Sequence, residues 1–381
     1  MNYCKICIQT DTRPNTKFSK DGICPSCNYF NSLKKVDWDR RFGILKDLVD
    51  QHKQRKENKF NSKFDCIIGV SGGKDSTRQA LYIRDKLKLR PLLVCLAYPP
   101  EQVTKVGVKN LSNIINLGFD LEIISLAPKN WKKLLKDGFI NYANFMKPSE
   151  QALFSSVPRL AIKYKIPLIF WGENPGLQVG DLGGAGKTEY DGNKMNFMNT
   201  LKGGRLEWMY NLGYNHKDIF NFEFPSEKEI KKNKLQIVYL GWFWKDWNIR
   251  SNGTTAALNG LNLRKDNFKN TQDLYGVFSL DEDWVTLNQM IKYYKFGFGR
   301  VTEYLSEDIR SGKISRERAI KIAEKYDGAC GDKYIKSFCK YIGISKEFFW
   351  KIVQDNVNKK YFRIGNDFKI KPLFKVGKGL I

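Results

Sequence analysis

Short apolar runs alternate with longer segments of helical periodicity through the first two thirds of this chain. Residues 66–70 are apolar throughout, as expected for a strand buried on both faces, and the next segment repeats apolar positions at helical intervals. Strands separated by helices predict an α/β fold, a parallel sheet with helices on both faces. The predicted strands cover 66–70, 91–97, 120–126, 167–171 and 236–243, and the predicted helices cover 37–57, 76–89, about 101–117 and 131–164.

Beyond residue 245 the apolar pattern is helical. Residues 291–328 contain two amphipathic helices joined at Ser311 and Gly312, and a further helix begins near Ser345. The C-terminal region is therefore predicted to be mainly helical. No apolar run approaches the ~20 residues that cross a membrane, and the N-terminus lacks the apolar stretch of a signal peptide. We expect a soluble cytoplasmic protein without a membrane partner.

The sequence SGGKDS, residues 71–76, lies where the first predicted strand passes into a helix. Free backbone N–H groups of a first helical turn, together with the helix dipole, attract anions. Gly72 and Gly73 let the main chain close around a phosphate, Lys74 supplies a positive charge, and Ser71 and Ser76 supply hydroxyls. The predicted ligand is a nucleotide phosphate or pyrophosphate; an ordinary strand-to-helix turn is the alternative.

SGGKDS resembles the pyrophosphatase loop (PP-loop) of enzymes that split ATP into AMP and pyrophosphate. It is not a Walker loop, which needs a glycine five residues before the GK pair. A near miss for that other loop is GDLGGAGKT at 180–188, where Asp181 replaces the first glycine and no strand leads directly into it. We interpret that segment as a glycine-rich substrate loop.

Four cysteines near the N-terminus have the spacing of a metal site, CxxC followed after sixteen residues by CxxC. Four thiolates leave no open coordination position, so the pattern predicts a structural zinc ribbon rather than a catalytic metal. A redox pair is the alternative. Cys66 and Cys95 lie inside predicted strands and are expected in the core, and Cys330 and Cys339 receive no role. The predicted zinc ligands are Cys4, Cys7, Cys24 and Cys27.

Charge and histidine content narrow the function further. The net charge of +25 allows a nucleic-acid partner, but the lysines are scattered, and a basic surface also attracts ATP or an acidic nucleotide sugar. Only two histidines occur, and Asn2 stands where one glutaminase type has its cysteine. Any ammonia must come from another protein or from solution. His216 is expected to be structural.

A second group of polar residues follows the fourth predicted strand in the sequence WGENPGLQVGD, 171–181. Glu173 and Asp181 could join Asp75 around Mg²⁺ on the ATP phosphates, because this cation takes oxygen ligands. Asn174 could orient a substrate amide, although a helix cap is the alternative. Arg159, in FSSVPR, is expected just before a helix and within reach of phosphate.

The combination of the zinc ribbon, SGGKDS, FSSVPRLA, WGENP and KFGFGRVTEYLSEDIRSG resembles the N-acetyl sugar amidotransferase family over nearly the whole chain. The resemblance implies conversion of a sugar N-acetyl group into an acetamidine, for lipopolysaccharide O-antigen or for flagellin glycans that carry pseudaminic acid. It also implies ammonia from a separate glutaminase and cyclase-like pair. Arg300 and Arg310 are candidate ligands of the acidic sugar, because guanidinium pairs with carboxylate.

The resulting hypothesis is an ATP-dependent, AMP-forming amidotransferase with three regions: a zinc ribbon at 1–35, a PP-loop ATP pyrophosphatase domain at 60–245 and a helical substrate or partner domain at 246–381. Lys74, Asp75 and Glu173 are its predicted catalytic residues. A tRNA-modifying enzyme of the thiolase type is the alternative, weakened because Ser155 and Ser156 stand where thiolases carry a cysteine pair. A nucleotide-binding scaffold is a third reading. The sequence does not identify the sugar or show whether the protein forms a homo-oligomer.

Overall fold

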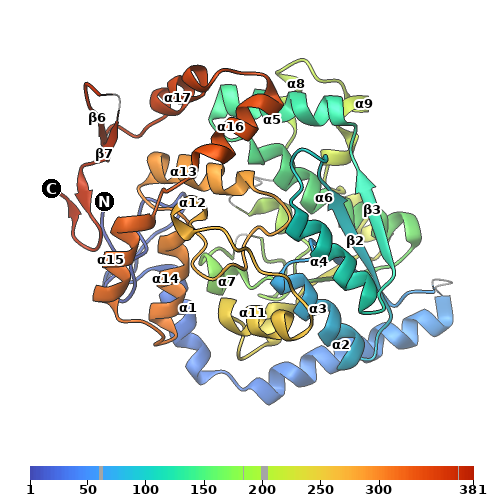
Figure 1. Cartoon of the computed structure of the whole chain (residues 1–381). Coiled ribbons are helices and arrows are strands. Elements are labelled where there is room, and N and C mark those ends of the chain that lie inside the picture. The colour runs from blue at the N-terminus through green and yellow to red at the C-terminus, as the bar shows by residue number, and fades with distance from the viewer. Residues whose placement is uncertain (60–62, 183, 199–204, 368) are drawn as a thin grey trace.

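The largest sheet among the described residues has five parallel strands in the order β3-β2-β1-β4-β5, and its strands β2 and β3 lie toward the right in Figure 1. The structure is a computed structural model that describes residues 1–59, 63–182, 184–198, 205–367 and 369–381. The chain builds outward from β1 through β2 to β3 and then returns to place β4 on the other side of β1. The strands are β1 (Cys66–Gly69), β2 (Pro91–Ala97), β3 (Leu121–Ser125), β4 (Leu168–Trp171) and β5 (Gln236–Tyr239).

Helices cover both faces of this sheet, which confirms the predicted α/β class. Cys66 and Ile68 of β1 face a core shared with α2 (Trp38–Lys59), α3 (Lys74–Asp85) and α4 (Lys105–Asn116). Ile67, one position out of phase, faces the opposite core with α6 (Met146–Tyr164) and α10 (Glu227–Lys232). Cys66 and Cys95 are buried in the first core as expected, and burial raises the pKa of Cys95 to about 12.

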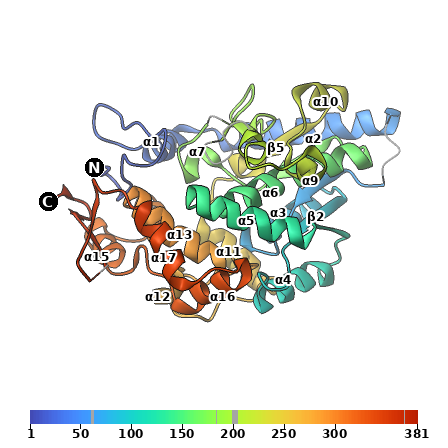
Figure 2. The same cartoon turned by 90° about the horizontal axis from the view of Figure 1, so that it is seen from above.

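The C-terminal region is mainly helical, as predicted, and three of its helices, α13 (Trp284–Phe296), α16 (Asp332–Ile342) and α17 (Lys346–Asp355), join α5 (Pro128–Tyr142) and α6 in a third large core. In Figure 2 the later helices gather on one side and the sheet lies on the other. The other helices of this region are α11 (Ile249–Leu258), α12 (Phe268–Thr271), α14 (Arg300–Arg310) and α15 (Arg316–Tyr326). Two short hairpins end the chain: β6 (Phe362–Ile364) with β7 (Ile370–Pro372), and β8 (Phe374–Lys375) with β9 (Gly379–Leu380).

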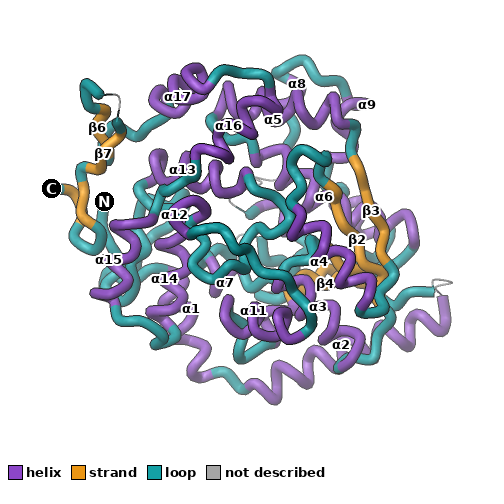
Figure 3. Tube along the Cα trace, viewed as in Figure 1, coloured by secondary structure: helices purple, strands orange, loops and turns teal. Residues whose placement is uncertain are grey.

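The N-terminal segment is held by these C-terminal elements, and both chain ends lie on the same side of the molecule in Figures 1 and 2. Its metal-binding pattern lies on a short turn closed by a bridge between Tyr3 and Thr10 and on the start of α1 (Pro25–Ser32). Gly22, between the two cysteine pairs, has a φ of 76°, a left-handed conformation that glycine adopts without a steric penalty. Figure 3 shows how few strands the chain has outside the central sheet.

Three predicted element boundaries are wrong. The strand expected at 236–243 ends at Tyr239, and residues 240–243 form a 3-10 turn. The single helix expected at 131–164 is two helices, α5 and α6, because Ala143 adopts a left-handed conformation with φ 43°. Arg159 does not precede a helix but lies inside α6. That helix continues through Pro158 because Val157 and Ala161 are buried against the sheet, so packing outweighs the lost backbone hydrogen bond.

The remaining short elements connect the sheet to its surroundings. Among the described residues, no helix is long and apolar enough to cross a membrane. In the segment 180–188, Gly183 lies outside the described residues, and the described part forms turns rather than the strand and helix of a Walker loop. These elements are η1 (Leu33–Lys35), α7 (Pro175–Gln178), η2 (Met195–Phe197), α8 (Glu207–Tyr210), α9 (His216–Ile219), η4 (Phe220–Phe222) and η5 (Leu240–Phe243).

Candidate active site at the carboxyl ends of β1 and β4

The loop SGGKDS lies at the point where the strand order of the sheet reverses, between β1 and β4. Ligands of open parallel sheets bind at such points. Gly73 is the residue before α3, so Lys74, Asp75 and Ser76 form the first helical turn and their backbone N–H groups have no partners within the helix. Gly72 has a φ of 77°, and a Cβ there would lie 3.0 Å from the backbone of Asn110 in α4. The loop therefore packs closely against α4, and its free backbone N–H groups can bind an anion.

Lys74 and Asp75 form a close ion pair that a C-terminal helix completes. Lys74 Nζ lies 2.8 Å from Asp75 Oδ2, and Asn252 of α11 donates through Nδ2 to Asp75 Oδ1 at 2.6 Å. Arg78 donates to Asn252 Oδ1 at 2.6 Å and binds both carboxylate oxygens of Asp246. The fully buried Asn252 thus joins the loop to the segment after β5.

Glu173 follows β4 and lies close enough to Asp75 for the two carboxyl groups to interact. Enclosure by protein, followed by the negative charge of Asp75, raises the pKa of Glu173 to about 7. A hydrogen bond with Gln178 and the charges of Lys74 and Arg300 act in the opposite direction. The structure therefore brings all three predicted catalytic residues into one electrostatic environment.

The other residues of the WGENPGLQVGD segment have structural contacts. Asn174 caps α7: its Oδ1 accepts from Leu177 N at 3.2 Å, and its Nδ2 donates to Gly241 O at 3.3 Å. These contacts match the helix-cap alternative and use both ends of the amide that was predicted to orient substrate. Asp181 lies in the turn after α7, where its backbone N–H bonds to Pro175 O.

Arg159 and Arg310 lie among protein partners that differ from the predicted ones. Arg159 donates to the backbone carbonyl of Glu223 at 2.5 Å and pairs with its carboxylate at 3.3 Å, so its contacts run to η4 and not to the loop. Arg310 donates to Leu177 O at 3.3 Å. The electrostatic partners of its guanidinium include three of the four N-terminal cysteines, and these contacts link α14 to the cysteine cluster instead of identifying a sugar ligand.

A wall of the site comes from the C-terminal region. The Phe278 ring lies 4.1 Å from Lys74 Nζ and stacks on Tyr304 with ring centroids 3.7 Å apart. The Arg300 guanidinium lies 5.4 Å from the same Phe278 ring. Glu307 of α14 accepts from Ile249 N at 2.7 Å, and burial raises the pKa of Glu307 to about 7.

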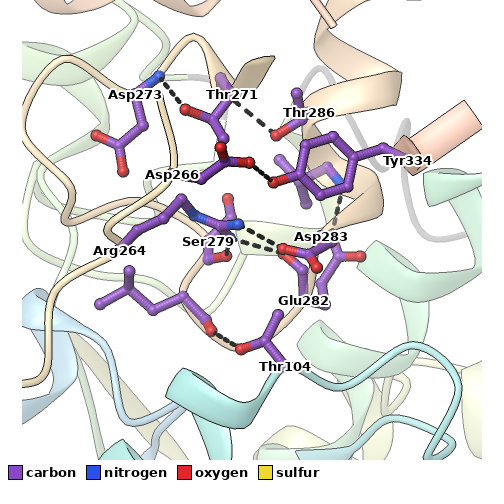
Figure 4. A network of polar contacts seen from close by, with 12 residues as sticks. Thr104, Arg264, Asp266, Thr271, Asp273, Ser279, Glu282, Asp283, Thr286 and Tyr334 are labelled. Atoms are coloured by element: carbon purple, nitrogen blue, oxygen red, sulfur yellow. Dashed lines mark hydrogen bonds and ion pairs between the residues drawn. The ribbon is translucent and has the colours of Figure 1, made fainter. Parts of the chain in front are cut away.

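A network of polar contacts fixes the segment that carries Phe278 (Figure 4). Arg264 pairs with Asp283 and donates to the carbonyl oxygens of Ser279 and Glu282. Thr104, at the start of α4, donates to the carbonyl of Leu280. The segment between Arg264 and Asp283 is therefore attached both to its own region and to the sheet domain.

The four N-terminal cysteines fit a zinc ion. Their sulfur atoms all lie within 4.8 Å of one another, and Cys7 Sγ is 3.7 Å from Cys24 Sγ. Four Zn–S bonds of ~2.3 Å at tetrahedral angles would place sulfur atoms about 3.8 Å apart. Backbone N–H groups of Gln9 and Cys24 point at Cys7 Sγ and Cys4 Sγ, which stabilises thiolates. The site is closed by protein, as a structural metal requires.

The predicted magnesium ligands do not form such a cluster. Within the described ranges, the four cysteines are the one group of three or more metal-ligating side chains. The charge of Asp75 nevertheless acts on Glu173, and Mg²⁺ is commonly bound by one or two carboxylates plus substrate phosphates. These two residues therefore fit a Mg²⁺ that ATP brings, whereas the structure does not group Asp181 with them.

Two further site residues, Asn252 and Phe278, had no signal in the sequence, whereas Tyr304 and Glu307 lie in the stretch KFGFGRVTEYLSEDIRSG that carries the family resemblance but were given no role. Asn252, Phe278, Tyr304 and Glu307 come from segments more than 170 residues beyond the loop, and each has a residue type common in ordinary cores and helices. A hydrogen bond, a ring contact or burial identifies them only after the chain is folded. The family resemblance pointed to α14 through Arg300 but not to its neighbours.

Part of this chain matches known proteins. The family model "LPS biosynthesis protein WbpG-like, C-terminal domain" matches residues 264–375. The uncharacterized protein MJ1599 of Methanocaldococcus jannaschii is 28% identical over 114 residues, which are 29% of this chain and 38% of that protein. The chain thus matches less than two fifths of the length of that relative. The WbpG-like match supports the family resemblance indicated by the motifs.

Two solved structures illustrate the weak overall structural similarity of this chain to known proteins. The NH3-dependent NAD synthetase from Campylobacter jejuni aligns with 59% of this chain and 97% of its own, at 17% identity and a TM-score of 0.27. The U34-tRNA thiolase NcsA from Methanococcus maripaludis aligns with 90% of this chain and 95% of its own, at 12% identity and a TM-score of 0.27. These TM-scores are too low to argue from, so the nucleotide assignment rests on the geometry of the loop. The loop geometry indicates a nucleotide phosphate site, and the family model indicates a WbpG-like C-terminal region.

Proposed function

We propose that this chain, whose residues 264–375 match the WbpG-like C-terminal domain, is an ATP-dependent, AMP-forming amidotransferase acting on an acetamido sugar. The observation that carries the proposal is the position of Lys74 and Asp75. They lie in the first turn of α3 at the strand-order reversal, facing a wall from the WbpG-like region. An ATP site and a sugar-specific region would thus share one active site.

The acetamide oxygen is a poor leaving group until it is adenylylated. In the proposed first step it attacks the α-phosphorus of ATP, the bond to the β-phosphate oxygen breaks, and pyrophosphate leaves with the electron pair. Backbone N–H groups of the loop, with Lys74, would bind the β- and γ-phosphates and neutralise the charge that develops there. Asp75 and Glu173 would hold Mg²⁺, which when bound shields the phosphate charges.

In the second step ammonia attacks the activated carbon, loses a proton, and AMP departs with the former acetamide oxygen. The product is an acetamidine. The site residues mainly hold the oxygen in line with the α-phosphorus, which makes the reaction effectively unimolecular. We propose that ammonia comes from a separate glutaminase and cyclase-like pair, and that the product enters lipopolysaccharide O-antigen or flagellin glycans. ATP, Mg²⁺ and a structural Zn²⁺ are the proposed cofactors.

Sulfur transfer to tRNA is the alternative reaction, and the site gives it less support. Ser155 and Ser156 lie inside α6 with their hydroxyls bonded to the backbone carbonyl of Ala152. Among the described residues, the tetracysteine cluster lies in a separate N-terminal module and is closed, while Cys66 and Cys95 are buried in the core. A thiolate beside the loop, which sulfur chemistry needs, is therefore lacking in the described chain.

Exchange of labelled pyrophosphate into ATP tests the proposal. Exchange that depends on a nucleotide-linked acetamido sugar, with AMP as the nucleotide product, supports the amidotransferase; dependence on tRNA supports the alternative. Lys74→Ala and Asp75→Ala should each abolish AMP formation. Release of ADP and orthophosphate would contradict an AMP-forming reaction, and binding of ATP without turnover under all these conditions would indicate a scaffold.

A further inference from the structure

The Phe278 ring contacts two cationic side chains from different regions of the chain. Lys74 Nζ lies 4.1 Å from the ring centroid and Arg300 Cζ lies 5.4 Å from it. The two cations are therefore no more than about 9.5 Å apart, the two distances added together. Glu173 is affected by the charges of both. Lys74 and Arg300 thus lie in one electrostatic neighbourhood with a phenyl ring beside both.

Arg300 has no side-chain hydrogen bond or ion pair within the described part of the chain, although it is largely enclosed by protein. Two of the nearby acidic groups have other bonded partners, and the first of them, Glu303, pairs with Arg13 and with Lys292 at 3.0 Å. The second, Asp273, accepts backbone N–H groups of the loop that ends at Phe278. Glu150 and Glu173 also act on Arg300 through their charges, without a hydrogen bond or ion pair to it among the described residues. An enclosed guanidinium without a bonded partner is unfavourable in an empty site, and phosphate oxygens match its donor geometry.

Phe278 also lines a small polar cavity. The cavity has a volume of about 10 Å³, room for about one water molecule. Arg300 and Tyr304 both line it, and the Tyr304 hydroxyl is buried without a partner in the described structure. A movement of the Phe278 ring would join this cavity to the PP-loop and expose both cations and the hydroxyl to one ligand.

We propose that Arg300 and Lys74 bind the same triphosphate chain, and that Phe278 occupies part of the phosphate position until ATP enters. This inference rests on the proposed function and reassigns Arg300 from the sugar carboxylate to the phosphates. When the acceptor oxygen bonds to the α-phosphorus, the electron pair of the broken bond passes to pyrophosphate. Arg300 then stabilises that added charge together with Lys74. In this movement the Phe278 ring turns away from the Tyr304 ring on which it stacks.

Binding of inorganic pyrophosphate with Mg²⁺ tests this inference without the sugar, on the full chain by calorimetry. We expect Arg300→Met to weaken binding at least tenfold and Arg300→Lys to weaken it less. Phe278→Ala should tighten binding about threefold or more, because the ring no longer competes for Lys74. Arg90→Met is the matched control: Arg90 is an exposed arginine that pairs with Asp120, before β2 at the opposite edge of the sheet.

The outcomes separate this inference from the proposed function. If wild type does not bind pyrophosphate, the AMP-forming proposal fails with it. If wild type binds and Lys74→Ala does not, but Arg300→Met binds like wild type, the inference is overturned while the proposed function stands. In that case a raised KM for the acidic sugar in Arg300→Met would return Arg300 to the sugar. If Arg300→Met is poorly folded, the pyrophosphate affinities of Arg300→Lys and Phe278→Ala test the inference instead.

Discussion

Asn252 Nδ2 donates to Asp75 Oδ1 at 2.6 Å, and this bond connects the end of the phosphate loop with a helix 177 residues later in the chain. The same amide accepts from Arg78 through its other end. Asn252 is fully buried, so water does not replace either bond. The orientation of the Asp75 carboxylate, and through it of Lys74, therefore depends on α11.

Asn252→Ala should lower kcat/KM for ATP about 10- to 100-fold, because a hydrogen bond to a charged group contributes about 1.5–3 kcal/mol. Asn252→Asp should be worse, since it places a second carboxylate against Asp75. Initial rates of AMP formation at varied ATP measure the effect, with the melting temperature of each variant as the control for folding. Equal activity of Asn252→Asp and wild type would contradict a positioning role.

Removal of the N-terminal metal should loosen the segment that carries Glu173. Arg316 of α15 donates to the carbonyls of Cys7 and Cys4, and a Cβ on Gly180 would lie only 2.5 Å from Pro25 at the start of α1. The cysteine module is thus packed against both α15 and the turn after α7. Chelation should release one zinc per chain, lower the melting temperature by roughly 5 °C or more, and weaken MgATP binding.

Cys24→Ser should reproduce the effect of chelation, whereas Cys330→Ala should not. Cys330 is partly exposed and lies outside the cluster of sulfur atoms. Metal content measured together with thermal unfolding checks both variants. A Cys24→Ser protein that has lost its metal but keeps the wild-type melting temperature would show that the module has no structural role.

The contiguous sequence motifs predicted the phosphate loop and its residues. The contacts that distant segments such as the one with Phe278 make with this loop could not be predicted. SGGKDS placed Lys74 and Asp75 correctly at a strand-to-helix turn, because six neighbouring residues there determine the local backbone. Phe278 reaches the loop only because Asp273 and Arg264 fix the segment before Asp283, and nothing in its local sequence indicates that position. Ala143 likewise ends α5 in a conformation that alanine seldom adopts.

The raised pKa of Glu173 makes stability depend on pH. Its pKa is about 7 in the folded chain and near 4.5 when unfolded, so between these values the folded state binds more protons. The free energy of unfolding should therefore fall as pH rises from about 4.5 to 7. Glu173→Gln removes this penalty and should be more stable than wild type at pH 8, by roughly 1–3 kcal/mol, with little difference at pH 4.5.

Urea unfolding at pH 4.5 and pH 8 measures this difference. Glu317→Gln, an exposed position in the first turn of α15, is the control and should show a far smaller change between the two pH values. The same Glu173→Gln protein should lose AMP formation, so the substitution would raise stability and abolish activity. Lower stability than wild type at pH 8 would contradict an unfavourable ionised Glu173.

Gly72 and Gly213 form a matched pair that separates backbone strain from the close packing of the phosphate loop. Both have a left-handed φ, 77° and 81°, but a Cβ on Gly72 would lie 3.0 Å from the backbone of Asn110 and Leu111, whereas a Cβ on Gly213 meets no atom within 4 Å. Gly213→Ala should cost about 1 kcal/mol of stability from strain alone. Gly72→Ala should cost more, because α4 must move, and should also weaken pyrophosphate binding at least tenfold, because the N–H groups of the loop turn away from the ligand. Calorimetry of pyrophosphate binding and urea unfolding of both variants check the difference. Equal losses of stability with unchanged pyrophosphate binding would mean that the loop can separate from α4 without changing its anion site.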